Sequence, residues 1–207
     1  MQRIELTGTA QPNFIGCWNL ENPALCDGIV EFFEQHPVRQ RPGESGAGVN
    51  AAIKNSVDIN VNPADLEAGS HAVLASYMQA LHACFQDYQA QWPFLAGMLK
   101  VADIGDFNIQ RYLPGGHFAV VHSERTTLGS AHRVLAWMTY LNDVDDGGQT
   151  RFTHYGLDVK PERGKTLIWP AEWTHAHAGA VVTAGKKYVI TGWMHFPPAI
   201  KPPASSP

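Results

Sequence analysis

The feature of this 207-residue sequence that most constrains its fold is a change of hydrophobic period near residue 106. Beyond that point, short segments rich in Val, Ile, Thr, Tyr and Trp alternate with Gly, Pro, Asn and Asp. Successive side chains of a strand point to opposite faces of a sheet, so this pattern is typical of antiparallel β-structure with frequent turns. We therefore expect a mainly β protein of the α+β class. Its core would be a jelly-roll β-sandwich, or double-stranded β-helix, supported by N-terminal helices.

Two helices are expected before residue 106. Asn22-Pro23 combines a favourable N-cap with proline at the first helical position, and His36-Pro37 ends the element. Asn62-Pro63 repeats the signal and opens a helical region that reaches about Gln91. The second region carries a stripe of core residues at helical spacing: Val73, Leu74, Tyr77, Leu81, Phe85 and Tyr88.

The segment between these helices is less regular. Val38 to Asn50 is mostly polar, rich in glycine and without periodicity, so we interpret it as a mobile loop. We add the hypothesis that 38–54 forms a lid over the functional site. The alternation in Ser56 to Val61 predicts a strand.

The whole chain, 1–207, is expected to form one domain, because its length suffices for a substantial core. Residues 1–105 would buttress the β-helix core of 106–196, and the Pro- and Ser-rich 197–207 would form an extended or disordered tail. A net charge of -4 indicates neither a nucleic-acid nor a membrane-surface partner. The three cysteines lack C-x-x-C spacing, and the sequence shows no apolar signal region, so we expect a cytoplasmic protein with reduced thiols.

The residues that carry chemistry are His122-Ser123-Glu124, with His177 and Lys187 further along the chain. Two imidazoles and a carboxylate form the ligand set that leaves positions open on a non-heme iron(II). On an extended strand, residues two apart project to the same face, so His122 and Glu124 can reach one ion. A His-x-Glu motif alone is weak evidence, since any such pair matches it.

The motifs around these residues make the pattern specific. Over about residues 106–196, their order and spacing resemble the prolyl-4-hydroxylase-like branch of the iron(II)/2-oxoglutarate-dependent dioxygenases. The motifs are Tyr112–Phe118, Tyr140–Val144, Gly147–Phe152, Pro161–Lys165, His177–Gly179 and Gly185–Tyr188.

The resemblance implies the same double-stranded β-helix as a catalytic core, with Fe(II) held by His122, Glu124 and His177. It also implies 2-oxoglutarate and O2 as co-substrates, hydroxylation of an unactivated C–H bond, and release of succinate and CO2. Most members of this branch carry Asp where this chain has Glu124, so direct ligation and ligation through water both stay open for that residue.

The second histidine ligand has two candidates, because the sequence reads Trp173-Thr174-His175-Ala176-His177-Ala178-Gly179. Both histidines can face one side of a strand, so alternation alone does not separate them. The His-Ala-Gly context and the ten-residue distance to Lys187 favour His177. His175 is then expected at the rim, or behind the ligands, where it would orient a ligand or the substrate.

Further residues are expected in the co-substrate pocket. Lys187, Thr191 and Trp193 share one face of a predicted strand. By resemblance, Lys187 pairs with the distal carboxylate of 2-oxoglutarate, Thr191 hydrogen-bonds beside it, and Trp193 lines the pocket. Tyr112 and Tyr140 fall where related enzymes place phenols against the co-substrate or the substrate, although a tyrosine in a β core is often only a packed aromatic.

The sequence does not identify the primary substrate. Members of this branch act on peptidyl proline and on other amino-acid-like or small molecules. One alternative is a cupin-like metal-dependent enzyme that does not use 2-oxoglutarate, which leaves Lys187 unexplained. A non-catalytic β-sandwich binding module and a nucleic-acid demethylase are weaker alternatives, and the acidic net charge argues against the demethylase.

Overall fold

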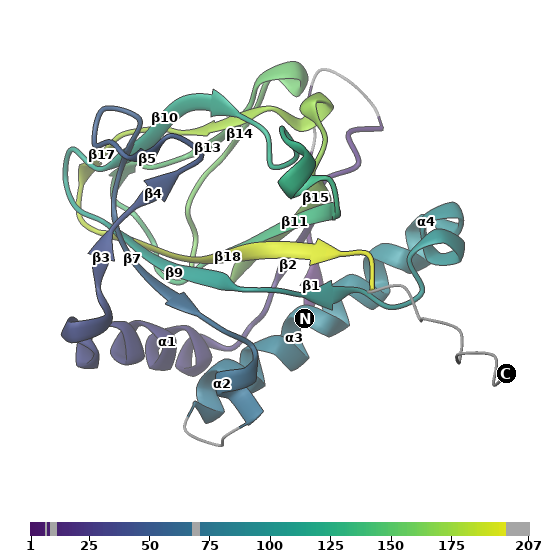
Figure 1. The fold of residues 1–207 in the computed structure, drawn as a ribbon, viewed down its shortest axis with the longest axis horizontal. Coiled ribbons are helices and arrows are strands. Elements are labelled where there is room, and N and C mark those ends of the chain that lie inside the picture. Colours follow the sequence, from purple (N-terminus) through teal and green to yellow (C-terminus); the bar gives the residue numbers. More distant parts are fainter. Residues whose placement is uncertain (7, 9–11, 68–70, 198–207) are drawn as a thin grey trace, which may run out of the picture.

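The computed structural model describes residues 1–6, 8, 12–67 and 71–197, and two antiparallel sheets face each other in it (Figure 1). Within the described residues, nine strands form the larger sheet, and β8 (Asp103–Ile104) pairs with β18 outside its main path. The main path runs β1 (Gln2–Arg3), β2 (Gly16–Asn19), β15 (Lys165–Pro170), β11 (Arg133–Tyr140), β18 (Lys187–His195), β9 (Phe107–Tyr112), β7 (Val57–Val61) and β3 (Arg41–Pro42).

The smaller sheet lies across from the larger one (Figure 1). Its order is β14 (Leu157–Val159), β13 (Thr150–Phe152), β16 (His177–Gly179), β10 (His117–His122) and β6 (Lys54–Asn55). Two short pairs complete the β-structure: β12 (Asp146–Gly147) with β17 (Val182–Ala184), and β4 (Glu44–Ser45) with β5 (Gly48–Val49). The connections include four 3-10 turns: η1 (Pro37–Arg39), η2 (Leu128–Ser130), η3 (Thr153–Tyr155) and η4 (Trp173–His175).

Most of the helical structure lies on the outer face of the larger sheet (Figure 1). They are α1 (Pro23–Gln35), α2 (Ala64–Glu67), α3 (Ala72–Gln91) and α4 (Pro93–Met98). The predicted cap of α1 is confirmed, since the Asn22 side chain accepts a hydrogen bond from the Leu25 backbone N–H at 3.1 Å. The predicted stripe on α3 is also confirmed, except that Val73 is only partly buried: Leu74, Tyr77, Leu81, Phe85 and Tyr88 are all in the core. None of the helices in the described part of the chain has the length and apolar character needed to span a bilayer.

Strand β18 separates two hydrophobic cores. Tyr188, Ile190 and Met194 pack in the core shared with the helices. Val189 and Trp193 belong to the core between the two sheets. The alternation expected along this strand is therefore confirmed, and it turns one face of β18 toward the space between the sheets.

The expectation of an irregular loop over Val38 to Asn50 is wrong. This segment contains η1, β3 and the β4–β5 hairpin. The pairs are too short to leave a hydrophobic period, and β3 is fixed by long-range pairing of Arg41 with Asp58 of β7. Closure of 38–54 over the site stays a prediction, and residues 198–207 of the expected tail lie outside the described residues.

Candidate active site

A cavity of about 650 Å³ opens between the two sheets, and the predicted metal ligands lie on its wall. The larger sheet contributes residues of β9, β11, β15 and β18, and the smaller sheet contributes residues of β10, β13 and β16. The β4–β5 hairpin closes part of the rim through Glu44, Ser45, Gly46 and Ala47.

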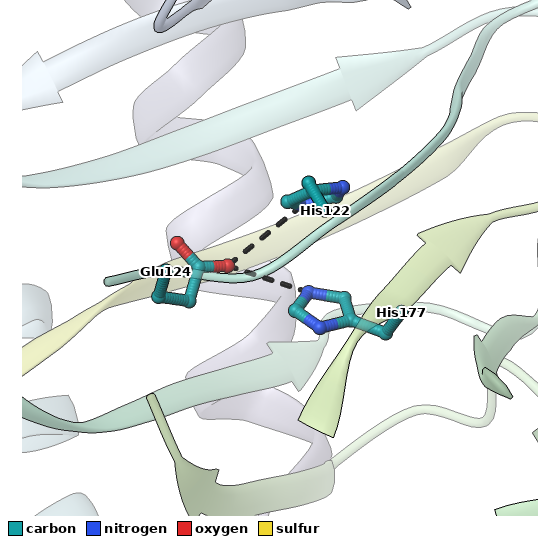
Figure 2. A group of neighbouring side chains, drawn as sticks. All are labelled: His122, Glu124 and His177. Carbon is teal, nitrogen blue, oxygen red and sulfur yellow. Dashed lines mark ion pairs between the residues drawn. The ribbon is translucent and has the colours of Figure 1, made fainter. Parts of the chain in front are cut away.

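His122, Glu124 and His177 converge at one point of this cavity (Figure 2). His122 ends β10 and stands opposite His177, the first residue of β16, in the antiparallel register. Glu124 lies two residues past the end of β10. Its Oε1 atom is 3.3 Å from His177 Nε2 and 3.8 Å from His122 Nε2. One candidate ligand atom from each residue fits within 4.8 Å of the others.

The two imidazoles are oriented by the backbone. His122 Nδ1 is 2.8 Å from the Val120 carbonyl oxygen, and His177 Nδ1 is 2.9 Å from that of His175. Since a carbonyl only accepts, each Nδ1 carries the proton and each Nε2 keeps its lone pair for a metal. Burial, followed by the nearby His177, lowers the pKa of His122 to about 4, so this ring is neutral near pH 7.

The carboxylate is held in its charged form. Burial raises the pKa of Glu124, but the nearby His177 and His122 and the Trp193 hydrogen bond lower it to about 2. The indole Nε1–H of Trp193 donates to Glu124 Oε2 at 2.7 Å. Two imidazoles that present Nε2 and one ionised carboxylate therefore fit the donor set of a divalent transition metal.

The structure distinguishes the two candidate histidines. His175 Nε2 lies 2.9 Å from the Asn13 carbonyl oxygen, and its Nδ1 lies 3.0 Å from the Thr174 hydroxyl. His175 does not line the cavity or join the metal-ligand cluster, considering the described residues. It orients His177 through its backbone carbonyl and not through its imidazole.

Lys187 is a buried cation on the cavity wall. Only 3% of the residue is exposed, and its ammonium donates to the Gly148 carbonyl oxygen at 3.1 Å and lies 4.4 Å from the Tyr112 ring centroid. No carboxylate of the described chain pairs with it. Burial lowers its pKa from 10.5 to about 8, so it remains mostly protonated near pH 7. The neighbouring Lys186 is exposed, as the alternation predicted.

The other predicted pocket residues divide into two groups. Tyr112, Thr191 and Trp193 line the cavity. The Tyr112 hydroxyl donates to Gln110 Oε1 at 2.7 Å, and that of Thr191 donates to the Trp137 carbonyl oxygen at 2.8 Å. Tyr140 is not among the described residues that line the cavity; its hydroxyl contacts Thr150 Oγ1 at 2.6 Å and the Val159 carbonyl oxygen at 3.2 Å.

Sequence reasoning missed two cationic residues of the wall. Lys54 is buried and pairs with Asp58 at 2.5 Å, while its ammonium also donates to the Glu44 carbonyl oxygen. Arg133 lies with its guanidinium 3.6 Å from the Trp193 ring centroid and donates to the Glu124 carbonyl oxygen at 2.9 Å. No local motif marks either residue, since both reach the cavity only through long-range strand pairing.

Comparison with known proteins agrees with this geometry. Residues 107–195 match the model of the 2OG-Fe(II) oxygenase superfamily. Prolyl 4-hydroxylase subunit alpha-1 of Homo sapiens is 28% identical over 112 residues, which is 47% of this chain and 21% of that protein. Probable prolyl 4-hydroxylase 9 of Arabidopsis thaliana is 30% identical over 114 residues, 42% of this chain and 40% of that protein. The chain thus spans less than half the length of either relative.

Two solved structures share the fold. A Pseudomonas putida prolyl-4-hydroxylase aligns with a TM-score of 0.70 at 16% identity, covering 89% of this chain and 94% of that one. The viral collagen prolyl hydroxylase of Paramecium Bursaria Chlorella virus-1, in its 2OG complex, aligns with a TM-score of 0.65 at 17% identity, covering 94% and 100%. The expected double-stranded β-helix is therefore confirmed.

Proposed function

We propose that this protein is an iron(II)- and 2-oxoglutarate-dependent dioxygenase, because residues 107–195 match the model of the 2OG-Fe(II) oxygenase superfamily and the chain is similar to prolyl 4-hydroxylases. It would hydroxylate an unactivated C–H bond of its substrate. The observation that carries the proposal is a cavity that combines a His-Glu-His cluster with a buried lysine that has no carboxylate partner in the described chain.

His122, Glu124 and His177 would hold the iron, since their donor atoms converge and both imidazoles present Nε2. Bound iron(II), together with 2-oxoglutarate and O2, supplies the oxidising power for C–H hydroxylation, with succinate and CO2 as co-products. The protein contributes ligand geometry, orientation of the co-substrate and exclusion of bulk water. Glu124 would ligate the iron directly.

Lys187 would receive the distal carboxylate of 2-oxoglutarate. An ammonium that is buried without a counter-charge is unfavourable, and an anionic ligand removes that cost on binding. The Thr191 and Tyr112 hydroxyl groups lie on the same cavity wall and can rotate to hydrogen-bond the ligand's carboxylates. Trp169, Met138 and Val189 supply apolar surface that keeps the pocket dry.

We propose an amino-acid-like substrate, with peptidyl proline as the class suggested by the names of the relatives. A related solved structure is a prolyl hydroxylase in complex with a peptide fragment. The partners would then be 2-oxoglutarate and a peptide or small molecule, with no nucleic acid and no membrane.

The cupin-like alternative uses the same ligand cluster without 2-oxoglutarate. This alternative supplies no anion for the buried ammonium of Lys187, whereas 2-oxoglutarate supplies its distal carboxylate. The two functions therefore differ in whether 2-oxoglutarate joins the metal site.

The test is anaerobic reconstitution with Fe(II) and 2-oxoglutarate, followed by visible absorption spectroscopy of the metal-to-ligand charge-transfer band. The band should appear in the wild type, vanish in His177→Ala and persist in His154→Ala, which removes an exposed histidine. Bound iron without any band would refute the 2-oxoglutarate proposal and favour the cupin-like function.

A further inference from the structure

The carboxylate of Glu124 has two oxygens with different surroundings. Oε1 faces the two histidine Nε2 atoms at 3.3 and 3.8 Å. Oε2 is turned the other way and accepts the indole N–H of Trp193 at 2.7 Å. The indole therefore distinguishes the two oxygens and directs one of them toward the metal position.

A glutamate needs such a restraint more than an aspartate does. Its carboxylate follows one additional rotatable bond, so more rotamers must be excluded before an oxygen points at the metal. Glu124 also lies beyond the last residue of β10, where no strand pairing fixes the backbone of this residue. The direction of the Glu124 carboxylate must therefore come from side-chain contacts.

Trp193 and Arg133 restrain both ends of this residue. The Arg133 guanidinium packs on the Trp193 ring, with Cζ 3.6 Å from the ring centroid, and its Nη1 donates to the Glu124 backbone carbonyl. Trp193 is itself fixed on β18 by pairing with Ala136 of β11. Side chain and backbone of Glu124 are thus held through the same two residues.

We propose that Trp193 is a positioning residue that makes Glu124 a one-oxygen metal ligand in place of aspartate. The inference rests on the proposed function, because it requires a metal at the His-Glu-His cluster. The main role of Trp193 is then to orient the carboxylate ligand and not to bind the co-substrate. A shorter carboxylate at position 124 would not reach the indole, so the two residues are energetically coupled.

The test is a double-mutant cycle with Mn(II) as the probe, measured by electron paramagnetic resonance of the free ion. Trp193→Phe should weaken Mn(II) binding about tenfold or more in the Glu124 background, as orienting groups around ligands commonly do. In the Glu124→Asp background, the same substitution should change binding by about twofold or less. Trp137→Phe serves as control: it removes another buried indole N–H from the same sheet, but that residue faces the helices.

A second readout does not depend on the metal. The Trp193 indole proton should exchange slowly with solvent in the wild type and faster in Glu124→Asp, as followed by NMR of the side-chain N–H. Equal losses of Mn(II) affinity in both backgrounds, or unchanged exchange in Glu124→Asp, would overturn the positioning role while leaving the metal site intact. Wild-type protein that binds no Mn(II), or binding that survives His177→Ala, would overturn the proposed function together with this inference.

Discussion

Replacement of Lys187 by methionine should have opposite effects on stability and on co-substrate binding. Methionine keeps the unbranched shape of the lysine and removes its charge. A pKa lowered from 10.5 to about 8 corresponds to roughly 3 kcal/mol of unfavourable free energy for burying the ammonium. The variant loses the hydrogen bond to the Gly148 carbonyl, worth about 1 kcal/mol. The ligand-free variant should therefore be more stable than the wild type by about 1–2 kcal/mol at pH 7.

The gain in the free energy of unfolding of Lys187→Met depends on pH. Between the folded-state pKa of about 8 and the unfolded value near 10.5, unfolded wild-type protein binds more protons than folded protein does. Wild-type stability therefore rises with pH across this window. The advantage of Lys187→Met is full below about pH 8 and disappears as the pH approaches 10.5. Urea denaturation at several pH values measures it.

Binding should change in the other direction. In Lys187→Met, the distal carboxylate of 2-oxoglutarate would be buried without a counter-charge, a loss of about 3–5 kcal/mol, or roughly a hundredfold to several thousandfold in affinity. Isothermal titration calorimetry under anaerobic conditions with Fe(II) measures this loss, and Lys186→Met is the matched control because that neighbour is exposed. A variant that is less stable than the wild type without ligand, or that binds 2-oxoglutarate equally well, would refute the reasoning.

Four further outcomes are expected. The affinity of wild-type protein for 2-oxoglutarate should fall as the pH rises above about 8, where Lys187 loses its proton, and a flat calorimetric profile from pH 7 to pH 9 would contradict this. His175→Ala should lower the free energy of unfolding by about 1–3 kcal/mol, because the buried Asn13 carbonyl loses its partner, yet keep Mn(II) binding that His177→Ala abolishes. Tyr112→Phe should weaken 2-oxoglutarate binding by about threefold to tenfold in calorimetry. Tyr140→Phe should leave that affinity unchanged and lower the thermal midpoint, since its hydroxyl contacts Thr150 and the Val159 carbonyl oxygen and Tyr140 itself does not line the cavity; the reverse result would assign the co-substrate contact to Tyr140.

Local pattern predicted the elements that rest on local interactions. The Asn22 cap of α1, the α3 stripe and the alternation of β18 are all present, because capping and helical or strand periodicity act over a few residues. The irregular-loop expectation for 38–50 failed at β3, which pairs with the distant β7, and at the β4–β5 hairpin, whose two-residue strands are too short to leave a hydrophobic period. The β3–β7 pair joins residues that no short window of sequence contains.

The choice between His175 and His177 shows the limit of alternation. Both positions have the same parity, so a single strand through them would place both on one face. The chain instead forms the turn η4 up to His175 and starts β16 at His177, which directs the two rings differently. Tyr140 shows a related limit: it lies on the inner side of the sheet, but packing against Thr150 and Val159 separates it from the cavity.

The sequence by itself determined the residue types of the site, the spacing of His122, Glu124, His177 and Lys187, and the period of the strands and helices that carry them. These are properties of side-chain chemistry and short-range geometry. Only the tertiary structure decided that Oε2 of Glu124 is held by Trp193, that Lys187 is buried without a carboxylate partner in the described chain, and that Lys54 and Arg133 reach the wall. Those facts depend on which strands pair and how two sheets close over one space, and residues distant in the sequence meet only there.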